Sequence, residues 1–331
     1  MNRTIIVTGC AGFIGFSLAK QILKNHDRVI GVDCITDYYN PQLKLDRVKI
    51  LQKDDQFKFL KLDLTSVTDM EKLTASVKDS KDLHLVHLAA QPGIRYCAQN
   101  PESYINNNLV GFFRIIEYAR SVGVKHFIYA SSSSIYGGTP KIPFHVNDQV
   151  DAPISLYAAT KKSNELMAHV YSSVNGMATT GLRFFTVYGP WGRPDMSYYT
   201  FAEKIVRGEA LAVFNEGNMY RDFTYIDDVV EGVLSVLDRF TPSLPGVQQY
   251  KLYNIGNSEP VHLMEFIRVL EESLGKKAVI DLKPAQPGEV LSTYADIELT
   301  RAELGFNPKT SIQEGLPKFV EWYRQYHKID R

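Results

Sequence analysis

The first half of the chain alternates short apolar runs with stretches of helical periodicity. The apolar runs, rich in β-branched residues, predict strands over residues 4–8, 28–32, 57–62, 83–88, 126–130 and 179–184. Helical spacing predicts helices over residues 13–24, 67–77, 101–122 and 155–174. Several of the strands are apolar throughout, as buried parallel strands tend to be. The pattern therefore predicts an α/β fold, a doubly wound parallel sheet covered by helices.

The regular alternation of predicted strands and helices ends at about residue 186. Residues 189–194, Gly-Pro-Trp-Gly-Arg-Pro, are rich in turn formers, and shorter, mixed segments follow until a last helix expected over residues 312–326. A chain of 331 residues also exceeds the size of a typical single core. We expect a large domain over residues 1–185 and a smaller, interwoven C-terminal α/β lobe over residues 186–331.

The composition of the chain argues against some kinds of binding partner and indicates the cellular compartment. Lys and Arg total 37, as do Asp and Glu, so no nucleic-acid-binding surface is expected. Cys10, Cys34 and Cys97 lack C-x-x-C spacing, which argues against a structural zinc site and fits a reducing cytoplasm. The apolar start is broken by glycines and reads as strand, turn and helix rather than a secretion signal. No apolar run is long enough to predict a membrane span.

A glycine-rich turn follows the first predicted strand and opens the first predicted helix. Glycines there let the backbone approach a pyrophosphate, while the helix N-terminus supplies free N–H groups. Because strand and helix flank the turn as a dinucleotide-binding fingerprint requires, it predicts a Rossmann-type cofactor site. The turn's candidate cofactor-binding residues are Gly9, Gly12, Phe13, Ile14 and Gly15.

Further candidate cofactor-binding residues lie at or just after the ends of the second, third and fourth predicted strands. Asp33 ends the second strand, where a carboxylate accepts hydrogen bonds from a ribose diol and repels a 2′-phosphate, so NAD is favoured over NADP. Asp63 and Leu64 follow the third strand and could flank the adenine. Small residues after the fourth strand would let the backbone pass close to the cofactor; this segment is Leu88, Ala89 and Ala90.

Tyr157 and Lys161 stand four residues apart on a predicted helix, and a serine run, residues 131–134, ends the fifth strand. Side chains at this spacing share one helix face, so the ammonium would favour the phenolate and lower the pKa of the tyrosine. Such a pair is common on solvated helices when seen alone. With the serine run at the same sheet edge, it predicts a base and a hydroxyl that act on one substrate oxygen.

Glycine turn, serine run and Tyr-x-x-x-Lys, in this order, resemble the extended short-chain dehydrogenase/reductase family, and specifically its nucleotide-sugar branch. The resemblance spans nearly the whole chain and includes residues 106–111, 221–228 and 253–256. It implies that Asn108 contributes to cofactor binding and that Arg221 faces the nucleotide diphosphate, helped by Arg95. Many relatives place a further arginine near residues 286–289, where this chain has Gln-Pro-Gly-Glu. The resemblance also implies a homodimer formed through the helices over residues 101–122 and 155–174.

The same resemblance implies the chemistry. Tyr157 would take the proton of a sugar 4-hydroxyl while hydride passes from C4 to NAD, with Lys161 and Ser132 completing the catalytic set. Dehydratases of the family carry Asp-Glu after the catalytic hydroxyl, and decarboxylases usually carry Glu at the second position. This chain has Ser133 and Ser134 there, which we expect to face the substrate. The resemblance therefore favours a 4-epimerase.

Residues 186–196 are similar to a stretch of UDP-glucuronate 4-epimerases in which two positions, here Thr186 and Arg193, engage the sugar carboxylate. A guanidinium fork can hold a carboxylate through two hydrogen bonds. The sequence leaves a structural role for Arg193 open, such as a salt bridge to Asp195. It also leaves open a UDP-glucose or UDP-N-acetylglucosamine 4-epimerase, an enzyme that turns NAD over in net oxidation, and a non-catalytic NAD-binding regulator.

Overall fold

The computed structural model describes residues 3–78, 80–139, 141–242, 248–284 and 290–329. The chain forms two compact units, and each is assembled from separate stretches of the sequence. The first unit contains Met1–Gly137, Gln149–Arg183 and Val230–Tyr253. The second contains Gly138–Asp148, Phe184–Val229 and Asn254–Arg331.

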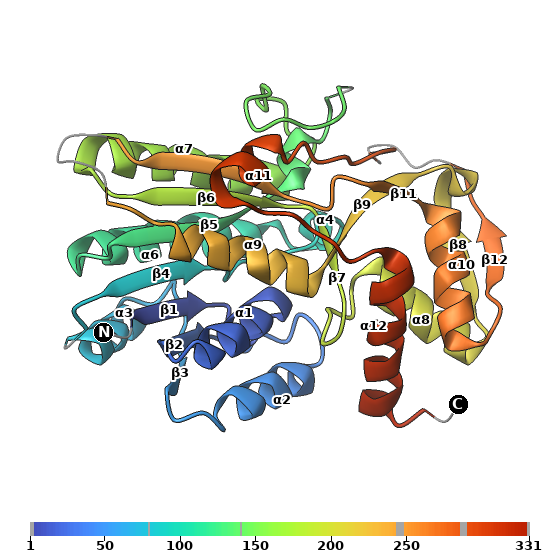
Figure 1. The fold of residues 1–331 in the computed structure, drawn as a ribbon, viewed down its shortest axis with the longest axis horizontal. Coiled ribbons are helices and arrows are strands. Elements are labelled where there is room, and N and C mark those ends of the chain that lie inside the picture. Colours follow the sequence, from blue (N-terminus) through green and yellow to red (C-terminus); the bar gives the residue numbers. More distant parts are fainter. Residues whose placement is uncertain (1–2, 79, 140, 243–247, 285–289, 330–331) are drawn as a thin grey trace. The chain divides into compact units, whose positions relative to one another are not determined.

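A seven-stranded parallel sheet is the framework of the first unit (Figure 1). Its strand order is β10-β6-β5-β4-β1-β2-β3. The bounds are β1 Thr4–Thr8, β2 Arg28–Asp33, β3 Phe57–Lys61, β4 Leu83–His87, β5 His126–Ser132, β6 Thr179–Phe184 and β10 Tyr250–Ile255. The six strands predicted in the first half of the chain are all present, and the predicted α/β fold with its Rossmann-type sheet is confirmed.

The strand order reverses between β1 and β4, which are neighbours in parallel register from Thr4 beside Leu83 to Thr8 beside His87. Right-handed crossovers run from β1 toward β2 on one side of this point and from β4 toward β5 on the other. Their helices therefore cover opposite faces of the sheet. Open sheets of this kind bind ligands at the carboxyl ends of the strands, next to the reversal.

The four helices predicted in the first unit are present, one of them divided, and three further helices were not predicted. The bounds of all these helices are α1 Phe13–Lys24, α2 Pro41–Leu51, α3 Val67–Val77, α4 Ile94–Gln99, α5 Pro101–Tyr104, α6 Gly111–Ser121 and α7 Leu156–Asn175, with α9 Ile226–Asp238 shared between the units. Helices α2, α4 and α9 were not predicted; in α2, cations occupy part of the buried face, including Lys44 and Arg47. The single helix predicted over residues 101–122 is divided by a π-helical turn, Ile105–Val110.

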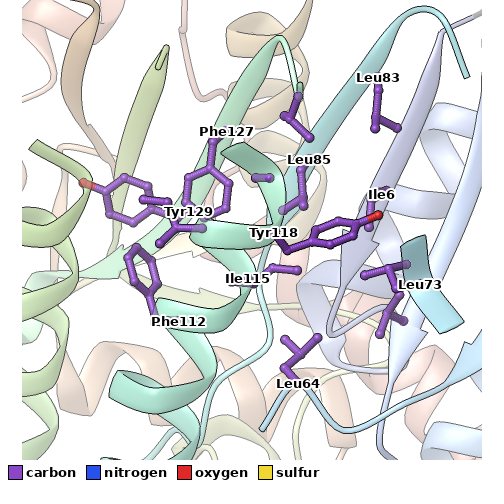
Figure 2. Close-up of a cluster of buried hydrophobic side chains, with 14 of the residues drawn as sticks. Ile6, Leu64, Leu73, Leu83, Leu85, Phe112, Ile115, Tyr118, Phe127 and Tyr129 are labelled. Carbon is purple, nitrogen blue, oxygen red and sulfur yellow. The ribbon is translucent and has the colours of Figure 1, made fainter. Parts of the chain in front are cut away.

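Apolar side chains of α3, α6 and α7 pack on one face of the sheet and form a buried core (Figure 2). Phe112 of α6 lies edge-on to Phe127 and Tyr129 of β5, with ring centroids 5.8 and 5.4 Å away. Burying an aliphatic or aromatic side chain of this size contributes about 2 kcal/mol. The core therefore holds β4 and β5 against α6 and fixes the positions of their carboxyl ends.

The second unit combines two small sheets with helices. Strands β7 Thr186–Tyr188, β9 Tyr220–Tyr225 and β11 Pro260–His262 form one sheet, and β8 Ala210–Val213 pairs with β12 Val279–Leu282 in the other. The helices are α8 Ser197–Arg207, α10 Leu263–Leu274, α11 Glu298–Leu304 and α12 Ile312–His327. The last helix expected from the sequence thus extends one residue further than predicted. Within the parts of the chain that the structure describes, no helix is long and apolar enough to cross a membrane.

Candidate active site

The glycine turn between β1 and α1 packs tightly against the segment that follows β4. Gly9 has a φ of +72°, and a Cβ on it would lie 2.8 Å from the backbone nitrogen of Ala89. A Cβ on Gly15 would lie 2.1 Å from the carbonyl oxygen of Gly9. No residue with a side chain fits either position without a shift of the backbone. Glycine is thus required to bring strand, turn and helix as close together as a pyrophosphate site needs.

Helix α1 begins at Phe13, with Gly12 as its N-cap. Phe13 is buried and Ile14 is partly exposed. The first N–H groups of a helix have no intrahelical partner, and they carry the positive end of the helix dipole. This cradle of glycine backbone and helix N-terminus fits the pyrophosphate of NAD.

Asp33 lies beside the glycine turn at the carboxyl end of β2. Its Oδ2 accepts a hydrogen bond from the Ala11 N–H at 3.1 Å, and its Oδ1 accepts one from the Ile35 N–H at 2.8 Å. These bonds fix the orientation of the carboxylate. Since two carboxylate oxygens offer about four acceptor sites, capacity remains for the ribose diol that the sequence assigns to Asp33.

The structure places the other cofactor candidates at the ends of β3 and β4. Asp63 is exposed and accepts hydrogen bonds from the N–H and hydroxyl of Thr65, whereas the side chain of Leu64 belongs to the buried core in Figure 2. After β4, the Leu88 N–H donates to the Thr8 carbonyl and the Ala89 N–H to the Thr8 hydroxyl. The partly buried Ala90 follows. Contacts of these residues with a cofactor stay a prediction.

Asn108 occupies the π-helical turn and is 1% exposed. Its Oδ1 accepts from the Gln91 N–H at 2.8 Å, while its Nδ2 donates to the Gln91 carbonyl and to Thr160 Oγ1. The Asn108 carbonyl accepts from Asn164 Nδ2 at 2.7 Å. Asn108 therefore joins the segment after β4 to α7, the helix that carries Tyr157. Its cofactor role rests on the resemblance.

Tyr157 and Lys161 lie in the first turns of α7, which begins after its N-cap Ser155. Lys161 is 3% exposed, and its Nζ donates to the Ala130 carbonyl of β5 at 2.8 Å. Burial lowers the pKa of Lys161 to about 8. Tyr157 packs edge-on to Tyr104, with ring centroids 6.1 Å apart. A buried cation on the same helix face as a phenol favours the phenolate, as a catalytic base requires.

The serine run follows the Ala130 carbonyl that Lys161 contacts. Ser132 is 8% exposed and ends β5, and its Oγ accepts from the Ser134 N–H at 3.1 Å and donates to the Ser134 Oγ at 3.1 Å. This bond caps a short 3-10 turn, Ser133–Tyr136. Ser133 and Ser134 are partly exposed in that turn. The end of β5 and the start of α7 thus bring the three candidate catalytic residues into one unit, linked by Lys161.

The candidate residues for the sugar carboxylate lie in the second unit. Thr186 begins β7 and is partly buried. Arg193 lies in the loop after β7 and donates to the carboxylate of Asp195, with Nε 3.0 Å from Oδ1 and Nη2 2.5 Å from Oδ2. The salt bridge that the sequence left open is therefore present. The same loop holds Trp191 with a φ of +63°.

Two arginines are the candidates for binding the diphosphate, and the structure describes the side chain of one of them. Arg221, in β9, donates through Nη1 to the carbonyls of Tyr220 and Leu291 at 2.8 and 3.1 Å. Arg95 lies in α4, and its side chain is outside the described part of the structure. Residues 286–289, where relatives carry an arginine, also lie outside it.

Sequence reasoning missed three residues that lie around Tyr157 and the serine run. Tyr104 packs on Tyr157, and Glu165 forms a buried ion pair with Arg183. Two signals were available: Glu165 is four residues after Lys161 on α7, and Arg183 interrupts an otherwise uncharged buried strand. A charge in such a strand requires a partner. Asp195 was noticed only as an alternative partner of Arg193.

Comparison with known proteins places the chain among enzymes that act on sugar nucleotides. The model of the NAD dependent epimerase/dehydratase family matches residues 5–256. Protein CapI of Staphylococcus aureus is 48% identical over 98% of this chain and 99% of its own length. UDP-glucuronate 4-epimerase 4 of Arabidopsis thaliana is 43% identical over 99% of this chain and 77% of its own. The crystal structure of UDP-glucuronic acid 4-epimerase from Bacillus cereus in complex with UDP-glucuronic acid and NAD superposes with a TM-score of 0.88 and 32% identity, covering 98% of this chain and 99% of that one.

Proposed function

The chain belongs to the NAD dependent epimerase/dehydratase family and is an NAD-dependent nucleotide-sugar 4-epimerase, and from that premise we propose that it interconverts UDP-glucuronate and UDP-galacturonate. The observation that carries the choice of substrate is Arg193, in a stretch similar to UDP-glucuronate 4-epimerases. Its guanidinium already holds a carboxylate, that of Asp195, in the two-bond geometry that a sugar carboxylate would use. The names of the relatives and of the B. cereus structure agree with this substrate.

In the proposed mechanism, Tyr157 takes the proton of the sugar 4-hydroxyl. Bound NAD would supply the acceptor and donor of hydride for sugar C4. The buried ammonium of Lys161 favours the phenolate of Tyr157 during proton removal. Ser132 donates a hydrogen bond to the same sugar oxygen, and Ser133 and Ser134 line the substrate. Neither serine supplies the carboxyl acid and base that dehydration needs, which favours epimerisation of the sugar over its dehydration.

Residues of the first unit would hold NAD. The glycine turn takes the pyrophosphate, Asp33 takes the adenosine ribose, and Lys161 takes the nicotinamide ribose. Arg221 and Arg95 would hold the diphosphate of the UDP-sugar. We place the reaction in the cytoplasm, because Cys10, Cys34 and Cys97 are all free.

One observation favours a second candidate, a 4-epimerase for a neutral UDP-sugar. Asp195 balances the charge of Arg193, so Arg193 needs no carboxylate on the sugar as a partner. To decide, purified protein is incubated with UDP-glucuronate, UDP-glucose and UDP-N-acetylglucosamine, and the gluco and galacto products and any pentose are separated. We expect turnover of UDP-glucuronate without net NADH absorbance at 340 nm, and none with Tyr157→Phe. Turnover of neutral sugars alone would refute the proposed substrate.

We also propose a homodimer. Helix α7 presents an apolar row at helical spacing, Leu166, Val170 and Val174, whose residues are 58, 52 and 75% exposed, and Phe113 of α6 is 51% exposed. A patch of this kind usually marks an interface. Light scattering should give twice the mass of one chain, and Val170→Glu should yield monomer; a wild-type monomer at micromolar concentration would refute the dimer.

A further inference from the structure

Glu165 and Arg183 form a buried ion pair in the first unit. Arg183 Nε lies 2.8 Å from Glu165 Oε1, and Nη2 lies 2.9 Å from Oε2. Both residues are 1% exposed. Burial alone would lower the pKa of the Arg183 guanidinium, but the hydrogen bonds and charge of Glu165 outweigh it and raise the pKa. The Arg183 guanidinium is therefore charged throughout the working range of an enzyme.

The pair contacts both ends of the segment over residues 131–136, which contains the serine run and the 3-10 turn and is called the serine turn below. Ser131, just before Ser132, donates its hydroxyl to Glu165 Oε1 at 2.7 Å. Tyr136 ends the turn, and its Oη accepts from Arg183 Nη1 at 2.7 Å. The guanidinium also lies over the Tyr136 ring, 4.9 Å from the centroid. The three candidate substrate-facing serines, residues 132–134, thus lie between two residues anchored on one ion pair.

The same pair joins the turn to the helix that carries the proposed base. Glu165 is one helical turn after Lys161 on α7, so their side chains lie on the same face. Lys161 holds the Ala130 carbonyl, and Glu165 holds the next residue, Ser131. Two consecutive residues of β5 are therefore bonded to two consecutive turns of α7. This fixes both the distance and the rotation between the end of β5 and the helix.

Stability alone does not explain such a pair. Removing two charges from water costs as much as their attraction returns, and well-packed apolar residues at such positions are often as stable or more so. What an ion pair with four fixed hydrogen bonds provides is orientation. Catalytic groups lose efficiency when displaced by fractions of an ångström, and neighbouring residues normally hold them.

We propose that Glu165 and Arg183 are positioning residues that hold Ser132 against the oxygen on which Tyr157 acts, through the hydroxyls of Ser131 and Tyr136. The inference rests on the proposed catalytic role of Ser132. It does not depend on which UDP-sugar is the substrate.

The test removes the two hydroxyls and leaves the ion pair in place, because breaking a buried pair can unfold a protein. Ser131→Ala and Tyr136→Phe are each expected to lower kcat roughly tenfold, with KM and bound NAD changed less than about twofold. Matched controls remove buried hydroxyls elsewhere in the first unit. Ser172→Ala affects the contact with the Gln249 N–H, and Tyr118→Phe changes a tyrosine of α6; both should keep kcat within about twofold.

A double-mutant cycle separates positioning from stability. In a Ser132→Ala background, Ser131→Ala and Tyr136→Phe should lower the residual kcat no further, since the group that they position is gone. Equal losses of kcat in both backgrounds, or losses matched by the control variants, would overturn the proposal. Full turnover by Ser132→Ala would overturn it as well, while product analysis with UDP-glucuronate would still decide the substrate independently. The cycle can be run with whichever UDP-sugar turns over.

Discussion

Arg193 donates two hydrogen bonds to Asp195, two residues further along the loop after β7, at 3.0 and 2.5 Å. The side chains are 22 and 25% exposed. A sugar carboxylate that binds Arg193 in the same two-bond mode has to displace Asp195. The loop therefore carries an internal competitor for the acid group that it is proposed to recognise, and Asp195 should affect the selectivity of the enzyme.

Replacement of Asp195 by asparagine tests this competition. Partly exposed ion pairs are worth about 0–1 kcal/mol, so Asp195→Asn should lower KM for UDP-glucuronate by about three- to fivefold and leave neutral UDP-sugars unchanged. Steady-state kinetics with each sugar measure this. Asp281→Asn, which breaks an exposed ion pair with Lys283 in the same unit, should have no such effect. A rise in KM for UDP-glucuronate would mean that Asp195 orients Arg193 instead.

Arg193 itself should control the fate of the oxidised sugar. A 4-keto glucuronate is a β-keto acid, which loses CO2 when the breaking bond aligns with the carbonyl π system. Arg193→Ala frees the carboxylate to rotate, so the ratio of pentose to epimerised product should rise severalfold. Product separation checks this, with Arg207→Ala, an exposed arginine of α8, as the control. An unchanged ratio at full activity would remove Arg193 from the carboxylate site.

The sequence predicted the sheet and its glycine turn because these depend on local pattern. Strand β1, for example, has an apolar centre, residues 5–7, and is followed by Gly9, which has a positive φ. Helix α2 escaped prediction because other segments supply partners for its cations: Lys44 donates to Thr36 after β2, and Arg47 donates to the Ala11 carbonyl in the glycine turn. Because these partners come from other segments, the buried face of α2 shows no periodic pattern of apolar residues in the sequence.

The missed parts of the site are contacts between distant residues. Glu165 and Arg183 meet because α7 returns the chain to β6, and nothing in their 18-residue separation specifies that they pair. The π-helical turn at Asn108 likewise depends on Gln91 and Thr160, from two other segments. The salt bridge of Arg193 could be considered from the sequence because Asp195 is only two residues away. Its geometry could not.

Asp33 should determine which dinucleotide binds. Lys44 is buried close enough to Asp33 for their charges to interact; burial lowers the pKa of Lys44, and the Asp33 charge opposes that shift. Asp33→Asn removes the charge that repels a 2′-phosphate and leaves the cation. After incubation with equal NAD and NADP, the ratio of NADP to NAD released from the protein should rise about tenfold or more. Asp63→Asn is the control; an equal rise there would contradict the assignment of the ribose to Asp33.

Two buried histidines should make the protein sensitive to acid. Burial lowers the pKa of both His87 and His126 to about 3, and His126 stacks on Phe240. Since the unfolded chain binds protons at a pKa of about 6.5, stability is lost as pH falls from 6.5 toward 3, by about 1 kcal/mol per histidine between pH 6.5 and 5.5.

Urea unfolding at pH 7.5, 6.5 and 5.5 measures this loss. His126→Gln keeps a group able to bond Thr180 and should remove the contribution of one histidine, whereas His169→Gln, on the exposed side of α7, should leave the slope unchanged. Identical slopes for wild type and His126→Gln would show that His126 titrates normally.

The last prediction concerns the chain's two tryptophans. Trp191, in the loop of Arg193, and Trp322, in α12, lie 5.3 Å apart between ring centroids, and Trp191 has a φ of +63°. A left-handed backbone costs a residue with a Cβ about 1–2 kcal/mol, which packing of the ring offsets. Trp191→Ala keeps the backbone strain and loses the ring, whereas Trp191→Gly loses both, so the glycine variant should be the more stable by about 1 kcal/mol. The control is the same pair of substitutions at Trp322 in α12.

There the order of stability should reverse, because glycine is about 1 kcal/mol less favourable than alanine inside a helix. Chemical denaturation of the four variants measures both orders of stability. An alanine variant that is more stable than the glycine variant at position 191 would exclude backbone strain in the loop.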